Sequence, residues 1–274
     1  MNNLVISLLT DFGLKDAYVG ILKGVIARFA PHALVIDICH EVPPQDIQRA
    51  GVLWASAVPH FPPGTVHVAV VDPGVGTERR ILAFEARNCL FLAPDNGLIG
   101  YACERREIRK VVSVQRTEHF LQPLSGTFHG RDIFAPVAAR LASGLPLEAL
   151  GPRTKRYLHR SLPRPSLKTR RAKGSRITEA RGEIVAVDRF GNAITNLQPL
   201  EGQKLLELRA GGFRWKKLSR AYGDVKKGRS VVLVESTGHL EIAVSHGRAD
   251  VELGLKLGDP VAAVWVHHFS SPMG

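Results

Sequence analysis

Two acidic residues follow directly after apolar runs that have the composition of buried β-strands. Asp72 comes after the run at residues 65–71 and opens a Pro-Gly turn, and Asp11 comes after the run at residues 4–10. In open parallel sheets, ligands bind beyond the carboxyl ends of the strands. A single Asp at such a place is most often a turn or cap residue. Two of them in one sheet favour a functional site.

A guanidinium and an imidazole accompany these carboxylates in the sequence. Arg79 lies seven residues after Asp72 in the segment DPGVGTERR and can fold back toward it. His129 stands at the expected start of a helix, where the helix dipole disfavours protonation and keeps a neutral imidazole available. An ordinary cap or surface histidine is the simpler interpretation of His129, and the sequence alone leaves both open.

A third cluster, near the C-terminal end of the chain, combines an acid, an aromatic ring and an amide around one tight turn. The segment DRFGNAITN carries Asp188, Phe190 and Asn192 on either side of Gly191. Such a turn suits recognition of a planar base, although a plain hairpin explains the same residues nearly as well.

The elements that would position these residues change character along the chain. Apolar runs at residues 4–10, 34–38 and 65–71 alternate with helical spacing at residues 18–29, 46–58 and 132–143. We therefore expect an α/β N-terminal domain with a mainly parallel central sheet over residues 1–152, which would be the catalytic domain. Short strands are expected at residues 183–187, 193–196, 204–208, 230–234, 240–244 and 261–266. They predict a small all-β, barrel-like C-terminal domain over residues 179–274.

Positive charge is concentrated between these two domains. The formal net charge is +12, and residues 153–176 carry ten Lys and Arg residues with no acid, so the rest of the chain carries only +2. With Pro163 and Pro165 and no periodicity, residues 153–178 are predicted to be a basic linker. A solvated linker is favoured over nucleic-acid or membrane contact, so nucleic acid is an unlikely partner.

The remaining composition is that of a globular protein. The three cysteines Cys39, Cys89 and Cys103 form no Cys-x-x-Cys pair, and we expect them to be reduced. No apolar run reaches the length of a membrane span, and no secretory signal pattern is visible. We expect a cytoplasmic location and no membrane partner.

Six blocks in order along the chain resemble the S-adenosyl-L-methionine hydroxide adenosyltransferase family, whose relatives include the nucleophilic fluorinases and chlorinases. The blocks are TDFGLKDAYVGILKG at 10–24, DPGVGTERR at 72–80, PDNGL at 94–98, TFHGRDIFAP at 127–136, DRFGNAITN at 188–196 and STGHLEIAV at 236–244. The resemblance spans both expected domains, so it is far more specific than any single motif.

The resemblance implies a homotrimer whose sites lie between the N-terminal domain of one subunit and the C-terminal domain of the next. It implies hydrolysis of S-adenosyl-L-methionine by water or hydroxide attack at the ribose C5′, which gives adenosine and L-methionine without a cofactor. The implied catalytic residues are Asp72, Arg79 and His129. The implied substrate-binding residues are Asp11 for the ribose, Asp16 and Asp188 for the ammonium, Phe128 for the pocket wall, Phe190 and Asn192 for adenine, and Ser236 for the methionine carboxylate.

Two departures and two alternatives accompany this interpretation. Thr237 stands where the halogenases carry Arg, and His246 stands where small residues are common. Asp72 beside a halide would cost Coulomb energy in a desolvated site, so halogenation is not expected. A binding module without turnover remains an alternative. A metal-dependent hydrolase with Asp11, Asp72 and His129 as ligands is the other, although we expect no metal.

Overall fold

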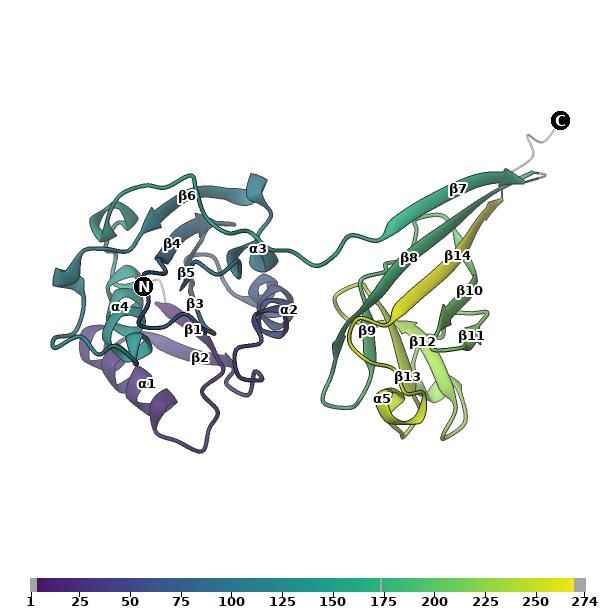
Figure 1. The fold of residues 1–274 in the computed structure, drawn as a ribbon, viewed down its shortest axis with the longest axis horizontal. Helices are drawn as coiled ribbons and strands as arrows, with labels where there is room; N and C mark the ends of the chain where they lie inside the picture. The colour runs from purple at the N-terminus through teal and green to yellow at the C-terminus, as the bar shows by residue number, and fades with distance from the viewer. Residues whose placement is uncertain (1–3, 173, 269–274) are drawn as a thin grey trace. The chain divides into compact units, whose positions relative to one another are not determined.

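The computed structural model describes residues 4–172 and 174–268, which form two compact units, Met1–Ser161 and Leu162–Gly274 (Figure 1). The first unit contains a six-stranded sheet in the order β2-β1-β3-β5-β4-β6. Its strands are β1 (Val5–Thr10), β2 (Leu34–Cys39), β3 (Val66–Val70), β4 (Ile81–Ala86), β5 (Cys89–Pro94) and β6 (Ile108–Ser113). Strands β2, β1, β3 and β5 are parallel, and β4 is antiparallel to both of its neighbours, β5 and β6, so the predicted mainly parallel sheet is confirmed.

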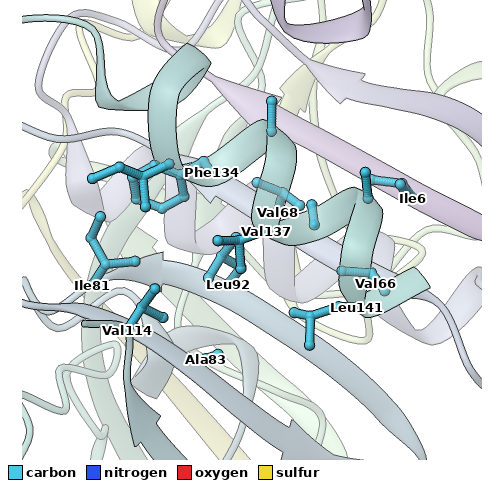
Figure 2. Packing of buried hydrophobic residues seen from close by; sticks show 14 of the residues in the cluster. Ile6, Val66, Val68, Ile81, Ala83, Leu92, Val114, Phe134, Val137 and Leu141 are labelled. Atoms are coloured by element: carbon cyan, nitrogen blue, oxygen red, sulfur yellow. The ribbon is translucent and has the colours of Figure 1, made fainter. Parts of the chain in front are cut away.

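Helices cover both faces of this sheet because its strands are apolar on both faces. Along β1, Ile6 and Leu8 belong to one core with α1 (Tyr18–Phe29) and α4 (Ala135–Ala142), whereas Leu9 belongs to a second core. The second core includes α2 (Ile47–Ala57) and α3 (Ile99–Ala102). Figure 2 shows Phe134, Val137 and Leu141 from the α4 side lying over strand residues. Each such side chain, once buried, stabilises the fold by about 1.5–3 kcal/mol.

Helix α1 forms because its apolar residues recur at helical spacing. Val19, Leu22 and Ile26 are its buried residues, and they lie on the face that meets the sheet. The helix ends at Phe29, just before Pro31, whose ring disfavours helical geometry in the residue before it. The observed bounds are those that the spacing predicts.

The parallel pairing of β1 and β3 brings the two functional strand ends together. Thr10 is in register with Val70, so the residues that follow both strands emerge at the same edge of the sheet. Asp11 and Asp72 therefore belong to one edge, as the sequence predicts.

The second unit is an antiparallel, barrel-like sheet of eight strands in the order β11-β10-β14-β8-β9-β13-β12, with β7 paired to β8. Its elements are β7 (Ser166–Ala172), β8 (Ser175–Val187), β9 (Ala193–Thr195), β10 (Lys204–Ala210), β11 (Phe213–Trp215), β12 (Ser230–Val234), β13 (Leu240–Val244), α5 (Ala249–Glu252) and β14 (Pro260–His268). Trp265, Leu240 and Ile242 belong to its single large core. The predicted all-β, barrel-like domain is confirmed.

Short helical turns complete the two units. They are η1 (Val58–His60), η2 (Arg105–Glu107), η3 (Thr117–His119), η4 (Gly130–Phe134), η5 (Leu147–Leu150) and η6 (Tyr222–Asp224), of which η4 is a π-helical turn. Within the described ranges, no helix is long and apolar enough to cross a membrane.

The segment predicted as a linker differs from that prediction. The backbone N–H of Leu158 donates to Asp95 at 2.8 Å and that of Arg160 donates to the carbonyl of Gly97 at 3.1 Å, so the segment up to residue 161 belongs to the first unit. Residues 166–172 form β7 of the second unit. Lysine and arginine side chains are well tolerated on an exposed edge strand, which is why a basic stretch without periodic apolar residues can still be a strand.

Candidate active site

A pocket of about 510 Å³ lies in the first unit, at the edge of the sheet where β1 and β3 end. Asp11, Asp72, Phe128 and His129 line it, so the structure brings four of the predicted site residues together. Its size is in the usual range for a small-molecule site.

Arg79 joins Asp72 and His129 through direct hydrogen bonds. Its Nε donates to both carboxylate oxygens of Asp72, at 3.0 and 2.8 Å, and its Nη2 donates to Oδ2 at 2.5 Å. The same Nη2 lies 2.9 Å from Nδ1 of His129. The Asp72 and Arg79 side chains are only 6% and 12% exposed, so this ion pair is shielded from water. Shielded, bidentate pairs of this kind are geometrically well defined.

Tight turns in the loop after β3 fold Arg79 back onto Asp72. The backbone N–H of Val75 donates to the carbonyl of Asp72, and that of Thr77 donates to the carbonyl of Gly74. Gly76 has a φ of 77°, and a Cβ at this position would lie 2.2 Å from the carbonyl oxygen of Gly126. Only glycine fits this left-handed, closely packed position.

The contact with Arg79 fixes the tautomer of His129. A guanidinium can only donate, so Nδ1 of the neutral imidazole must accept, and Nε2 then carries the hydrogen. Burial and, next, the positive charge of Arg79 lower the pKa of His129, which keeps the ring neutral at pH 7. His129 is the N-cap of the π-helical turn η4. The sequence analysis explained the neutral state of His129 by the helix dipole. The structure shows two further causes, which are burial and the charge of Arg79.

Asp11 follows β1, lines the same pocket as Asp72, and is held by the loop after β2. Its Oδ2 accepts from the backbone N–H of Gln45 at 2.8 Å. Burial raises the pKa of Asp11, and the nearby charge of Asp72 raises it further. Asp16 is exposed in the segment between β1 and α1 and is not part of the pocket lining.

Three aromatic rings form one wall of the pocket. Phe12, Tyr18 and Phe128 make edge-to-face contacts, with ring centroids 5.1 to 6.0 Å apart. Of these three, only Phe128 was predicted, from its place beside His129. The signal for the other two was their position on either side of Asp16, within the block that carries Asp11.

In the second unit, the predicted residues Phe190 and Asn192 line another pocket, of about 480 Å³, together with Tyr222 and His246 among others. Asp188 and Ser236 are not among its lining residues. Phe190 is 73% exposed, although it is a large aromatic residue. Sequence reasoning missed Tyr222 as a site residue and noted His246 only as a departure. Ser236 is exposed and contacts Glu235.

Asp188 shapes the turn that presents Phe190. Its carboxylate accepts from the backbone N–H groups of Phe190 and Asn192 at 2.8 and 2.9 Å, and from Nδ2 of Asn192 at 3.0 Å. Gly191 has a φ of 83°, and a Cβ there would lie 2.4 Å from Oδ1 of Asp250. The turn therefore needs both the acid and the glycine that the sequence places there.

A metal-ion site is not supported by the arrangement of these acids. Among the residues that the structure describes, no group of three or more His, Cys, Asp and Glu could hold a metal ion. The guanidinium of Arg79 lies between Asp72 and His129, where a shared metal would have to be.

Comparisons with known proteins agree on one family. The model of the SAM hydroxide adenosyltransferase N-terminal domain matches residues 6–151, and that of the C-terminal domain matches residues 182–262. A protein of Thermus thermophilus named (R)-S-adenosyl-L-methionine hydrolase is 41% identical over 266 residues, covering 92% of this chain and 96% of its own. A Salinispora tropica protein of the same name is 41% identical, covering 93% of this chain and 95% of its own.

A more distant relative and a solved structure are also similar to this chain over most of its length. A fluorinase of Nocardia brasiliensis is 25% identical, with 93% of this chain and 94% of its own covered. The crystal structure of an uncharacterized conserved protein from Thermotoga maritima superposes with a TM-score of 0.84 at 38% identity. It covers 94% of this chain and 99% of its own.

Proposed function

The chain belongs to the SAM hydroxide adenosyltransferase family and hydrolyses S-adenosyl-L-methionine, and from this premise we propose that water attacks the ribose C5′ and releases adenosine and L-methionine. The observation that carries the proposal is the shielded contact of Asp72, Arg79 and His129 in the pocket at the ends of β1 and β3.

The reaction needs a base for the attacking water but no acid for the leaving group. The sulfonium of the substrate leaves as a neutral thioether and takes the electron pair of the C5′–S bond, so no acid need protonate it. The attacking water forms the C5′–O bond and loses a proton. Nε2 of His129 carries a hydrogen and can only donate to that water, whereas Asp72 keeps free lone pairs. Asp72 is therefore the proton acceptor, and His129 orients the water.

The two carboxylates of the pocket suit a cationic substrate. Asp11, beside Asp72, is assigned to the ribose hydroxyls. The aromatic wall formed by Phe12, Tyr18 and Phe128 excludes solvent from the sulfonium and can face its positive charge. Asp16 is assigned to the methionine ammonium, which would have to approach from the exposed segment before α1.

The pocket of the second unit suits the planar end of a nucleoside. We assign Phe190 and Asn192 to adenine, since an exposed ring and an amide can stack on a base and hydrogen-bond to its edge. Asp188 is assigned to the ammonium and Ser236 to the methionine carboxylate, as the family resemblance implies. Asp188 performs this role in addition to holding its own turn.

These residues are divided between two units, and we propose a homotrimer in which the first unit of one subunit and the second unit of the next share each site. The proposal rests on the family resemblance and on the division of the assigned residues between the units. A cytoplasmic location and the absence of a cofactor belong to the same proposal.

The relatives that are 31–41% identical are named for the R form of the substrate. We propose that this chain shares that preference. The two forms differ in the arrangement of the groups around sulfur, so a pocket that places C5′ for attack can accept one and misplace the other.

The function is tested by incubating the purified protein separately with the R and S forms of S-adenosyl-L-methionine. We expect equal amounts of adenosine and methionine, formed faster from the R form, as quantified by liquid chromatography and mass spectrometry. Faster turnover of the S form would contradict the stereochemical proposal alone. Binding of either form without any product would favour the binding module, and a 5′-chloro nucleoside in the presence of chloride would favour halogenation.

A further inference from the structure

A buried histidine next to the first pocket takes no part in the proposed mechanism. His40 is the first residue after β2 and is only 4% exposed. Its Nδ1 lies 2.8 Å from Oγ1 of Thr10, the last residue of β1, which is fully buried. Neither residue lines the pocket, whereas Asp11 and Phe12, which follow Thr10, both do. The hydrogen bond between His40 and Thr10 therefore lies directly beside the pocket lining.

This histidine holds the segment after β1 at two points. The Thr10 hydroxyl that contacts its ring also accepts from the backbone N–H of Phe12 at 3.2 Å. The backbone N–H of Gly13, which has a φ of 69°, donates to the carbonyl oxygen of His40 at 2.8 Å. Asp11 lies between these two points of attachment, so His40 fixes the backbone on either side of it.

The loop that begins at His40 also holds the carboxylate of Asp11. The backbone N–H of Gln45 donates to Oδ2 of Asp11 at 2.8 Å, and Gln45 has a φ of 66°, which is unfavourable for a residue other than glycine. The next residue, Asp46, caps α2 by accepting from the backbone N–H of Arg49 at 2.8 Å. The loop is thus held at both of its ends, and it orients the Asp11 carboxylate from between them.

The surroundings of His40 determine which of its ring nitrogens carries the hydrogen. Nε2 lies 3.2 Å from Oδ1 of Asp37, and the other oxygen of Asp37 accepts from Nζ of Lys23 at 2.6 Å. Nε2 has no hydrogen-bond partner among the described residues, so its contact with Asp37 is electrostatic. A nitrogen lone pair would be repelled by the carboxylate, so the hydrogen of the neutral ring is on Nε2. Nδ1 then accepts from the Thr10 hydroxyl, whose oxygen keeps lone pairs for the backbone N–H of Phe12.

We propose that His40 is a positioning residue that, through the Thr10 hydroxyl and the backbone of Gly13, holds the Asp11 carboxylate in the orientation that accepts the ribose hydroxyls. The inference rests on the proposed function, because that function assigns Asp11 to the ribose. His40 does not line the pocket and acts only through the segment that carries Asp11. Its loss should therefore weaken ligands that carry the 2′- and 3′-hydroxyls more than ligands that lack them.

A second buried pair of the same kind provides a matched control. Oγ of Ser7 lies 2.7 Å from Nδ1 of His67, and both residues are fully buried. Ser7 lies on β1, three residues before Thr10, and neither member of this pair lines the pocket. Loss of the Ser7 hydroxyl should lower stability, as loss of the Thr10 hydroxyl does, but it should not change how the ribose is bound.

The test compares the affinities of adenosine and 2′,3′-dideoxyadenosine for the full-length protein by isothermal titration. The unmodified protein should prefer adenosine by at least about tenfold, because its two extra hydroxyls can donate to a carboxylate. Thr10→Val keeps the shape but removes the hydroxyl, and it should reduce this preference by about 3- to 10-fold through weaker binding of adenosine. Thr10→Ser, which keeps the hydroxyl, and Ser7→Ala should both retain the preference.

Two substitutions of His40 separate its contacts. His40→Gln can place an amide near the position of Nε2, beside Asp37, but leaves the Thr10 hydroxyl without its partner, so the preference for adenosine should fall as in Thr10→Val. His40→Asn can place its amide near the position of Nδ1, beside Thr10, and should retain the preference. The opposite order of these two variants would show that the contact with Asp37, and not that with Thr10, matters, and would overturn the proposal.

Product formation from the substrate and thermal unfolding are measured on the same proteins. If Thr10→Val does not fold, His40→Gln decides the matter. An unchanged preference in folded Thr10→Val, or an equal fall in Ser7→Ala, would overturn the proposal and leave the hydrolase intact. An unmodified protein that turns over the substrate without preferring adenosine would refute the assignment of Asp11 to the ribose, and the proposal with it. A protein without turnover would count against the proposed function, whereas a preference that is lost in Thr10→Val would still support the role of His40.

Discussion

The guanidinium of Arg79 contacts both Asp72 and His129, so one side chain fixes the hydrogen-bonding role of each. It occupies Nδ1 of the imidazole and thereby leaves a donor, Nε2–H, for a water. It also holds the carboxylate of Asp72 in one orientation through two of its nitrogens. The sequence named the three residues but left open which of Asp72 and His129 accepts the proton. In the proposed mechanism that choice follows from the tautomer of His129, which the sequence does not reveal.

Replacing Arg79 tests the electrostatic part of this arrangement. Arg79→Gln keeps a donor for Nδ1 but removes the positive charge that helps to lower the pKa of His129. The protonated imidazole becomes less unfavourable, so the pKa rises. Activity, which needs the neutral ring, should then begin to fall at a higher pH than in the unmodified protein.

The measurement is the dependence of kcat on pH, supported by nuclear magnetic resonance titration of His129. Arg79→Lys keeps the charge and serves as the control, with an acid limb close to that of the unmodified protein. An acid limb at the same pH in Arg79→Gln would show that the charge of Arg79 does not control His129.

Replacing Asp72 tests the proton acceptor. Asp72→Asn preserves size and hydrogen bonding but cannot accept the proton of the water, so kcat should fall by about 10²- to 10⁴-fold while adenosine still binds. The matched control is Asp95→Asn, which disturbs the comparable pair of Asp95 with Arg80, 2.5 Å apart and outside the pocket lining. Asp95→Asn can lower the melting temperature, but kcat should remain. Full turnover in Asp72→Asn would rule out Asp72 as the acceptor.

At the scale of elements, the helices and strands that were predicted correctly are those whose sequence pattern has a single physical cause. The bounds of α1 follow from its apolar spacing, and β12 and β13 from short apolar runs between turns. The hairpin of β4 and β5 was not predicted. Its two-residue turn is Arg87-Asn88, with φ of 50° and 58°, and arginine is an uncommon residue at a position that usually shows glycine or asparagine.

The basic segment is a second element that the local sequence did not predict correctly. Its charges and prolines predicted a linker, yet β7 pairs with β8 over seven residue pairs. Arg171 lies directly opposite Arg176, a like-charge pair that disfavours pairing. Pairing with β8, which also pairs with β14, supplies backbone hydrogen bonds that local sequence does not reveal.

The loop that carries Arg79 makes a prediction at this scale. Gly76→Ala would place a Cβ 2.2 Å from the carbonyl oxygen of Gly126, so the loop must move and the contact of Arg79 with Asp72 must change. We expect kcat to fall by at least about tenfold. Gly64→Ala is the matched control, because Gly64 also has a positive φ, 85°, but a Cβ there meets nothing within 4 Å.

Kinetics and thermal unfolding of both variants distinguish backbone strain at the glycine from displacement of the loop that carries Arg79. Each should lose about 1 kcal/mol of stability from the left-handed backbone position, and only Gly76→Ala should lose activity. Equal kcat in the two variants would mean that the packing of Gly76 on Gly126 does not position the catalytic residues.

At the scale of the whole molecule, the structure brings several of the predicted residues together in two pockets, one in each unit. Asp11 and Asp72 line one pocket, as expected from the shared edge of β1 and β3, and Phe128 and His129 line it too. Asn192 and Phe190 line another, in the second unit. The missed residues Tyr18 and Tyr222 are exposed aromatic residues, whose role depends on neighbours distant in sequence.

Subunit mixing tests whether neighbouring subunits complete each other's sites. Asp72→Asn disables the first unit, and Phe190→Ala with Asn192→Ala disables the second. When the two inactive proteins are co-expressed with different tags and purified as mixed trimers, about a third of the sites should combine two intact units. The recovered activity should approach that fraction. A mixture that is no more active than its components, or an active monomer in light scattering, would contradict the shared site.

The most direct test of the whole account follows the oxygen of the attacking water. The protein is incubated with S-adenosyl-L-methionine in water enriched in oxygen-18, and the products are analysed by mass spectrometry. Attack at C5′ predicts adenosine that carries one heavy oxygen at its 5′ position, together with unlabelled methionine, and this product should be nearly absent with Asp72→Asn. Unlabelled adenosine, or methylthioadenosine with a labelled homoserine, would contradict the account, because water would then have attacked elsewhere or not at all.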